Sequence, residues 1–217
     1  MTAERHSTAR EAELVTDPVE KATVESRNAV NQFDLVMTMV EHWTSSTGPK
    51  PFRLRPSMIL DLHRAALESL SLYAGNWRPG SVAIAESKHT PPASFLVPGL
   101  IEELCDHVNE NFRKSAIHLA AYVMWKVNWI HPFVDGNGRT SRALSYLVLC
   151  VRLGYRIPGT KTIPDLISVD KMPYYDALEA ADKGDLTQME KLLGELLANQ
   201  LLTVIDAAGL DEKEAES

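Results

Sequence analysis

The sequence predicts one domain built almost entirely of α-helices. Its 217 residues correspond to roughly one domain of about 150 residues with short extensions, and 45% of them are apolar. That apolar content is enough for a single buried core without disulfides or a structural metal. Between the two ends, the apolar residues recur mostly three and four positions apart, which is helical rather than alternating spacing. We therefore expect an all-α fold.

Four stretches of the chain carry this helical spacing most clearly, and each predicts a helix with one face in the core. In chain order the apolar positions are Ile59, Leu62, Ala66 and Tyr73; Leu100, Leu104 and Val108; Ile117, Ala120, Ala121 and Met124; and Leu192, Leu193, Leu196, Leu197 and Leu201. The last stretch, from about 185 to 206, opens with Asp185 and Gln188, a variant of the capping box.

One segment interrupts the helical pattern. Residues 74–98 concentrate glycine and proline around a short alternating piece at 81–87, which predicts a loop with a small β-hairpin. Long loops in compact domains often carry function, although a plain connection between helices would have the same composition.

The ends of the chain and its charge set further expectations. We divide the chain into an N-terminal extension at 1–19, a domain at 20–205 and an acidic tail at 206–217. The net charge of −7 argues against a nucleic acid or an anionic membrane as partner. Cys105 and Cys150 have neither metal-binding nor disulfide spacing, and the first residues include no apolar targeting run. These features indicate a reducing compartment, and we expect a cytoplasmic protein.

The sharpest local signal lies at 130–142, with the sequence IHPFVDGNGRTSR. Pro132 disfavours helical backbone at His131, so the preceding helix should end there. The turn at 136–138 permits backbone angles that a Cβ would forbid and allows a ligand to approach the main chain. A second helix should begin directly after the turn.

The start of this second helix has the properties of an anion site. Its first turn offers free N–H groups and the positive end of the helix dipole, and Arg139 and Arg142 project from one face of that turn. Two guanidinium groups beside free backbone donors suit a di- or triphosphate. Asp135 adds a carboxylate that could hold a divalent ion, and His131 is a base that titrates near neutral pH. Each residue alone has a structural alternative, such as a helix cap, a plain turn or a solvated face, but the combination at this spacing predicts a phosphate site.

The run HPFVDGNGRTSR resembles the signature of Fic domain proteins, His-Pro-Phe-x-Asp/Glu-Gly-Asn-Gly-Arg-x-x-Arg, at every specified position. A looser resemblance covers roughly 20–205, including a flap hairpin at about 81–92. The resemblance implies a Fic-type helical bundle and transfer of AMP from ATP to a protein hydroxyl on Ser, Thr or Tyr, with release of pyrophosphate.

The resemblance also implies a role for each motif residue. His131 would be the general base, and Asp135 would hold Mg²⁺ against the phosphates of ATP. Gly136, Asn137 and Gly138 would form the anion hole, with Arg139 on the phosphate chain and Arg142 on the γ-phosphate. A phosphoryl-type displacement of this kind depends mainly on positioning and charge neutralisation.

Partners and control follow less directly from the resemblance. The flap would dock a protein target by adding it as a strand, with Lys88 and His89 able to line the nucleotide or the target, or simply to be solvated. Many Fic proteins carry an inhibitory helix whose glutamate pairs with the second motif arginine. Glu25 stands near that place but lacks the surrounding pattern, so it could be a degenerate inhibitory carboxylate or a surface residue. Inhibition by a separate antitoxin chain is the other expectation.

Two rival functions stay open at this point. A Fic-type fold could transfer another nucleotide or a phosphoryl group, although Doc toxins, which transfer the γ-phosphate, replace the glycines found here at 136 and 138. A non-catalytic nucleotide-sensing or interaction module is the second rival. The intact His131 argues against that module, because a pure binder needs no base there.

Overall fold

The computed structural model describes residues 13–45, 47 and 51–215, with 207–215 as backbone only. In chain order its helices are α1 (Pro18–Thr44), α2 (Pro56–Leu67), the short 3₁₀ turn η1 (Ser94–Leu96), α3 (Val97–Glu110), α4 (Ala116–Ile130), α5 (Asn137–Leu153), α6 (Ile163–Val169), α7 (Met172–Asp182) and α8 (Thr187–Ala215). The prediction of an all-α fold is confirmed.

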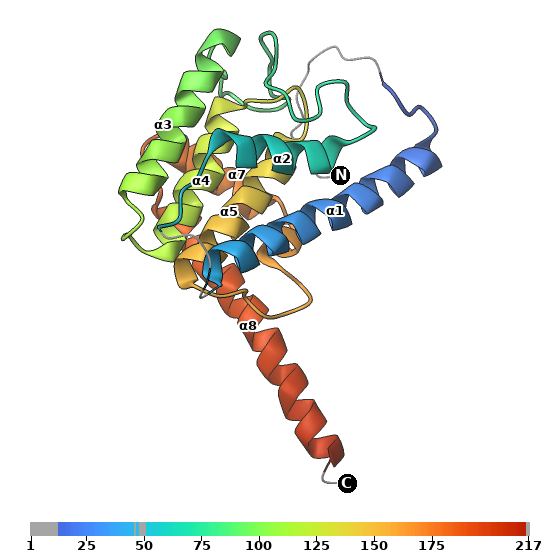
Figure 1. Cartoon of the computed structure of the whole chain (residues 1–217), viewed down its shortest axis with the longest axis vertical. Helices are drawn as coiled ribbons and strands as arrows, with labels where there is room; N and C mark the ends of the chain where they lie inside the picture. Colours follow the sequence, from blue (N-terminus) through green and yellow to red (C-terminus); the bar gives the residue numbers. More distant parts are fainter. Residues whose placement is uncertain (1–12, 46, 48–50, 216–217) are drawn as a thin grey trace.

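Helices α4 and α5 form the centre of the bundle, and the other helices pack around this pair. Helices α3, α7 and α8 lie against α4, while α1 and α2 lie side by side and both pack against α5 (Figure 1). The C-terminal part of α8 projects from the body of the molecule (Figure 1). The long loop between α2 and α3 contacts the short loop between α4 and α5, where the N–H of Arg78 donates to the carbonyl of Pro132.

Side-chain hydrogen bonds explain where three helices begin. The Asp17 carboxylate accepts a hydrogen bond of 2.8 Å from the N–H of Glu20, and the Ser115 hydroxyl accepts one of 3.1 Å from the N–H of His118. The Asp185 carboxylate accepts from the N–H of Thr187 at 3.0 Å, which fits the predicted start of the last helix. These contacts satisfy N–H groups that the first helical turn cannot satisfy itself.

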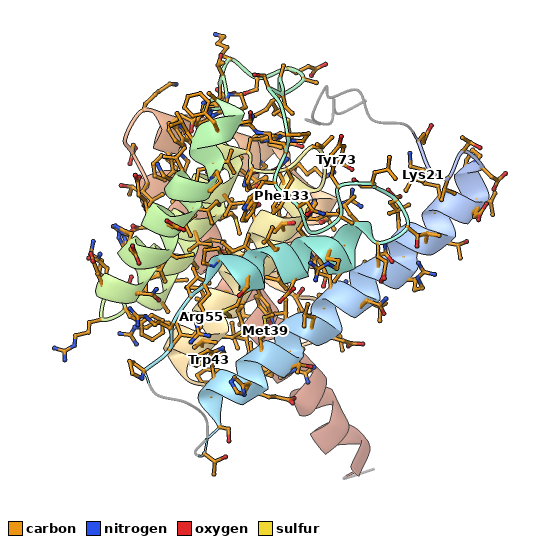
Figure 2. All side chains as sticks on the ribbon, turned by 45° about the horizontal axis from the view of Figure 1, so that its top comes forward. Lys21, Met39, Trp43, Arg55, Tyr73 and Phe133 are labelled. Carbon is orange, nitrogen blue, oxygen red and sulfur yellow. The ribbon has the colours of Figure 1, made fainter. Side chains whose placement is uncertain are left out.

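The core sits between the predicted apolar stripes. Ile59, Leu62, Leu104 and Leu193 are completely or almost completely buried, and Phe133 from the loop after α4 fills the centre of the bundle. Figure 2 shows Phe133 in the interior, whereas Lys21 lies on the outward end of α1. The stripe of leucines on α8 packs against the same core. Core packing thus uses the face that the helical spacing indicates.

The segment at 79–92, which we call the flap segment, differs from the predicted hairpin. It is extended and holds a turn closed by a hydrogen bond of 3.3 Å from the N–H of Ser87 to the carbonyl of Ile84. Its described residues form no strand beyond a single bridge position at Ile84. The alternation at 81–87 gives the segment an inner and an outer side, but within the described residues no neighbouring strand turns this into a ladder.

The described residues at the two ends of the chain do not test the predicted domain boundaries. Residues 1–12 of the expected N-terminal extension lie outside the described part, and α8 continues to Ala215, so the backbone of the expected acidic tail begins as helix. Among the described residues, no helix is both long and apolar enough to span a bilayer.

Candidate active site

A cavity of about 620 Å³ opens where the loop after α4 meets α1, the flap segment and α7. Its walls combine residues from α1, α2, the flap segment, α4, α5, α6 and α7, including Glu25, His89, His131, Arg142 and Tyr174. The predicted site residues other than Lys88 all line this one cavity. The size and the mixture of apolar walls and polar groups suit a small organic ligand.

His131 stands at the end of α4, in the first position that is no longer helical. Its φ of 50° and ψ of 58° are left-handed, a conformation that residues with a Cβ adopt rarely and often at functional sites. Its Nδ1 lies 3.3 Å from the carbonyl oxygen of Asn128. A carbonyl only accepts, so Nδ1 carries the proton and Nε2 keeps its lone pair. The imidazole is therefore held in the tautomer that a general base needs.

The environment of His131 also keeps its imidazole neutral. The side chain is 7% exposed, and burial lowers its pKa to about 4, with the nearby Arg78 charge acting in the same direction. Asn128 is itself fixed, because its side-chain amide donates to Ser141 Oγ and to Tyr174 Oη, both at 2.8 Å. His131 thus rests on a hydrogen-bond network that joins α4, α5 and α7.

The turn at 136–138 has little room for any residue other than glycine at its first position. Gly136 has a φ of 76°, and a Cβ there would overlap Cδ2 of Leu67 on α2. The side-chain amide of Asn137 donates to the carbonyl of Phe133 and accepts from its N–H, both at 2.9 Å. Because the Asn137 side chain closes the loop in this way, its share in an anion hole would come from the backbone N–H.

Helix α5 begins at Asn137, as predicted, and carries both motif arginines toward the cavity. The Nη2 of Arg139 lies 2.9 Å from Oδ2 of Asp135, and its Nη1 lies 3.7 Å from Oε1 of Glu25. For Arg142, the described part of the chain contains no ion-pair partner. One guanidinium is thus shared between two carboxylates, and the other faces the cavity without one.

Asp135 is the residue whose chemistry fits Mg²⁺. Its half-exposed carboxylate lines the cavity and offers hard oxygen atoms, while the described residues include no cluster of three acidic, histidine or cysteine side chains that could hold a metal alone. A divalent ion bound mainly by phosphate oxygens needs only one or two carboxylates from the protein. The donor set therefore fits an ion that arrives together with a nucleotide.

Glu25 differs from the expectation for an inhibitory glutamate. It does face the cavity from α1, but its carboxylate lies beside Arg139, the first motif arginine, rather than beside Arg142. The pair is loose, with 45% of the Glu25 side chain and 32% of the Arg139 side chain exposed.

The two flap residues singled out from the sequence have different positions. Lys88 is exposed and lies outside the residues that line the cavity. His89 lines the cavity, and its Nε2 donates to the carbonyl of Trp129 at 2.7 Å. His89 is therefore an anchor of the flap segment rather than a solvated tip.

Two functional neighbours of the motif were not found from the sequence. His63 stacks on Phe133 at 3.6 Å between ring centroids, and its Nε2 donates to the backbone carbonyl of Asp135 at 3.0 Å. Arg78 donates through Nε to the carbonyl of His131 at 2.8 Å. His63 lies on the apolar face of α2, which sequence spacing assigns to the core, and Arg78 lies in a loop that periodicity does not describe.

Comparison with known proteins finds similarity to Fic proteins. The model of the Fic/DOC family matches residues 53–149. Protein adenylyltransferase Fic of Drosophila willistoni is 27% identical over 182 residues, covering 82% of this chain and 34% of the relative. The protein of the same name from Nematostella vectensis is 29% identical over 197 residues, covering 83% and 43%.

Solved structures are similar in fold. Fic-1 from C. elegans superposes with a TM-score of 0.66 at 23% identity, covering 85% of this chain and 52% of that structure. The chain thus spans between a third and a half of the length of these curated relatives, and the matched region contains the whole motif.

Proposed function

We propose that the chain contains a domain of the Fic/DOC family, whose model matches residues 53–149, and that it is a protein adenylyltransferase. The proposed reaction transfers AMP from ATP to the hydroxyl of a Ser, Thr or Tyr side chain in a target protein and releases pyrophosphate. The curated relatives that carry this name support the proposal.

The single observation that carries the proposal is that a neutral histidine and the N-terminus of an arginine-bearing helix line the same cavity. His131 keeps the lone pair on Nε2, and the N-terminus of α5 with Arg139 and Arg142 lines the same cavity. A site that only bound phosphate would need the arginines and the helix start but no such base.

In the proposed mechanism, each residue of the motif has one role. The hydroxyl oxygen of the target attacks the α-phosphorus of ATP, its proton passes to Nε2 of His131, and the bond from the α-phosphorus to the pyrophosphate oxygen breaks. The backbone N–H groups at 136–138, Arg139 and Arg142 neutralise the charge on the phosphate chain. Asp135 would hold Mg²⁺, whose charge would neutralise the phosphate oxygens further.

Two alternatives share this site. Transfer of another nucleotide or of a phosphoryl group would use the same base and the same anion site, and a nucleotide-sensing module would use the anion site alone. Gly136 and Gly138 favour nucleotidyl transfer over transfer of the γ-phosphate, since these positions differ in Doc toxins.

Labelled ATP separates these functions. We expect label from the α-phosphate, and not from the γ-phosphate, to become covalently attached to protein when the chain is incubated with Mg²⁺, ATP and cell lysate. His131→Ala should lower the transfer rate by about 10²–10⁴-fold and leave ATP binding unchanged. His42→Ala, at an exposed histidine of α1, is the matched control and should keep full activity.

Other results of the labelling experiment would favour one of the alternative functions. Attachment of the γ-label would replace adenylyl transfer by phosphoryl transfer. ATP binding with no transfer of either label would favour the sensing module, and full activity without His131 would remove the proposed base.

Partners and location complete the proposal. The target protein docks along the flap segment, which borders the cavity at Ile84, Ser87 and His89, and a separate antitoxin chain is a possible inhibitor. The two cysteines are free and buried, which supports a reducing compartment such as the cytoplasm.

A further inference from the structure

Arg78 is a buried arginine whose hydrogen bonds all go to backbone carbonyl groups. Its side chain is 2% exposed, and no carboxylate pairs with it in the part of the chain that the structure describes. Burying a guanidinium without a counterion is costly unless other groups satisfy its donors. The carbonyl groups that accept from the Arg78 guanidinium must therefore offset its desolvation cost.

The contacts of Arg78 join the catalytic turn to both ends of the flap segment. Its Nε donates to the carbonyl of His131 at 2.8 Å, and Nη1 donates to the carbonyl of Gly80 at 2.8 Å. Nη2 donates to the carbonyl of Pro92, and the backbone N–H of Arg78 donates to the carbonyl of Pro132 at 2.9 Å. One planar group therefore fixes residues 80, 92 and 131 relative to one another.

The position of Arg78 at the end of α4 gives these contacts an electrostatic reason. The last carbonyl groups of a helix lack partners within the helix and carry the negative end of its dipole, so a buried cation is favourable there. The flap segment supplies a second cap on the same turn, because His89 Nε2 donates to the carbonyl of Trp129 at 2.7 Å. The flap segment and the helix that carries the base thus complete each other's hydrogen bonds.

The cavity itself excludes a direct role for Arg78. Glu25, His89 and the motif arginines line it, but Arg78 is not among the described residues that do. Its influence on a ligand must pass through His131 or through the flap segment.

We propose that Arg78 is a positioning residue that clamps the flap segment to the backbone at His131. The clamp would keep the imidazole of His131 at a fixed distance and orientation from the segment along which the target docks. The catalytic part of this inference rests on the proposed adenylyl transfer, whereas the clamp itself does not. The left-handed conformation of His131 is the feature that the clamp holds, since the carbonyl of His131 accepts from Arg78.

Arg78→Lys is the sharpest variant, because it keeps the positive charge but offers one nitrogen in place of the planar fork. Arg152→Lys is the matched control: Arg152 also donates to two backbone carbonyls, those of Lys114 and Arg113, at the opposite end of α5 and away from the cavity. Both variants should still unfold in one cooperative transition above the assay temperature, with Arg78→Lys the less stable of the two, and this separates positioning from loss of the fold.

Three readouts on the full chain decide the proposal. In Arg78→Lys we expect backbone amides of the flap segment to exchange hydrogen about tenfold faster or more, while amides of α5 and α8 keep their rates. The imidazole NMR signal of His131, assigned by its absence in His131→Ala, should shift. The affinity for Mg-ATP should stay within about twofold while the transfer rate falls by roughly 10–100-fold, the loss that a small misplacement of a reacting group causes.

The outcomes distinguish the clamp from the proposed function. Unchanged exchange in the flap segment together with an unshifted His131 signal would overturn the clamp, as would equal effects in Arg152→Lys. A transfer rate that falls only in proportion to ATP affinity would overturn the positioning role. If the wild-type chain transfers no label at all, the proposed function fails, while the exchange and NMR readouts still decide the clamp.

Discussion

The carboxylate of Glu25 on α1 lies beside the guanidinium of Arg139 on α5, with 3.7 Å between Oε1 and Nη1. Asp135 holds the same guanidinium from the other side at 2.9 Å. An incoming phosphate chain would therefore have to share Arg139 with these two carboxylates. Before any ligand binds, Arg139 is therefore already paired with two carboxylates.

Replacing Glu25 should release part of that engagement. Exposed ion pairs contribute about 0–1 kcal/mol, so Glu25→Gln should tighten ATP binding by at most about fivefold, with a similar gain in transfer rate at low ATP. Calorimetric titration with Mg-ATP measures the first and label transfer the second. Glu41→Gln, at an exposed glutamate on the same helix, is the control. A gain far above tenfold would instead identify Glu25 as a strong inhibitory residue.

The two motif arginines should both bind phosphate, and Arg142 should bind it more strongly. Charge-assisted hydrogen bonds contribute about 1.5–3 kcal/mol, so Arg142→Ala should weaken ATP binding by roughly 10–100-fold. Arg139→Ala should weaken it less, because two carboxylates already compete for that guanidinium. Thermal unfolding of the ATP-free variants tests the alternative: melting far below the wild type and the exposed-site control Arg113→Ala would make these arginines structural.

Gly136 should tolerate no side chain. Gly136→Ala combines a positive φ of 76° with an overlap onto Leu67, and we expect it to lower the free energy of unfolding by about 2–4 kcal/mol. Urea denaturation measures this loss. Gly80→Ala is the matched control, because nothing lies within 4 Å of a Cβ there. Equal stability of the two variants would contradict the geometry of the turn.

The free energy of unfolding should fall in mild acid through two buried histidines. Burial lowers the pKa values of His63 and His131 to about 4, below the ordinary value near 6.5, so the unfolded chain binds their protons more readily. Their contribution is complete above pH 6.5 and is lost as the pH falls toward 4, by about 2 kcal/mol for each at pH 5. Urea denaturation at pH 7.5 and pH 5 should show a smaller loss in His131→Ala than in the wild type. A loss of equal size would mean that folding leaves the pKa of His131 unchanged.

The transfer rate should depend on pH in the same region. A base whose pKa is about 4 is already neutral at pH 6, so the rate measured with saturating ATP should stay level between pH 8 and 6 and fall below about pH 5. Single-turnover label transfer across this range measures the profile. An acid limb centred near 6.5 would show that His131 is solvated in the reacting complex.

The helical parts of the fold could be predicted from the sequence because local rules govern them. Pro132 ends α4 at Ile130, Gly136 precedes the first residue of α5, and the leucines of α8 pack on the core, each as spacing and backbone preference indicate. The flap hairpin was predicted wrongly, since alternation at 81–87 says nothing about whether a partner strand exists among the described residues.

The supporting residues of the site could not be predicted for a different reason. Arg78 acts on a carbonyl 53 positions away, and His63 acts on one 72 positions away. Every residue has a backbone carbonyl, so residue types do not show which carbonyl accepts a distant hydrogen bond. No pattern of side chains therefore predicts these partners. The pairing of Glu25 with Arg139 rather than Arg142 likewise depends on how α1 crosses α5, which periodicity does not determine.

The walls of the cavity come from nearly the whole length of the chain, from Glu25 on α1 to Asp182 at the end of α7. During synthesis α1 leaves the ribosome before the other helices that line the cavity, yet it can border no complete cavity until the last of them has emerged and docked. A nascent chain that lacks α7 has an incomplete cavity, so the proposed transfer could not start before α7 has docked. Once α7 has docked, any ligand that binds the cavity would favour the assembled state over every partly folded one.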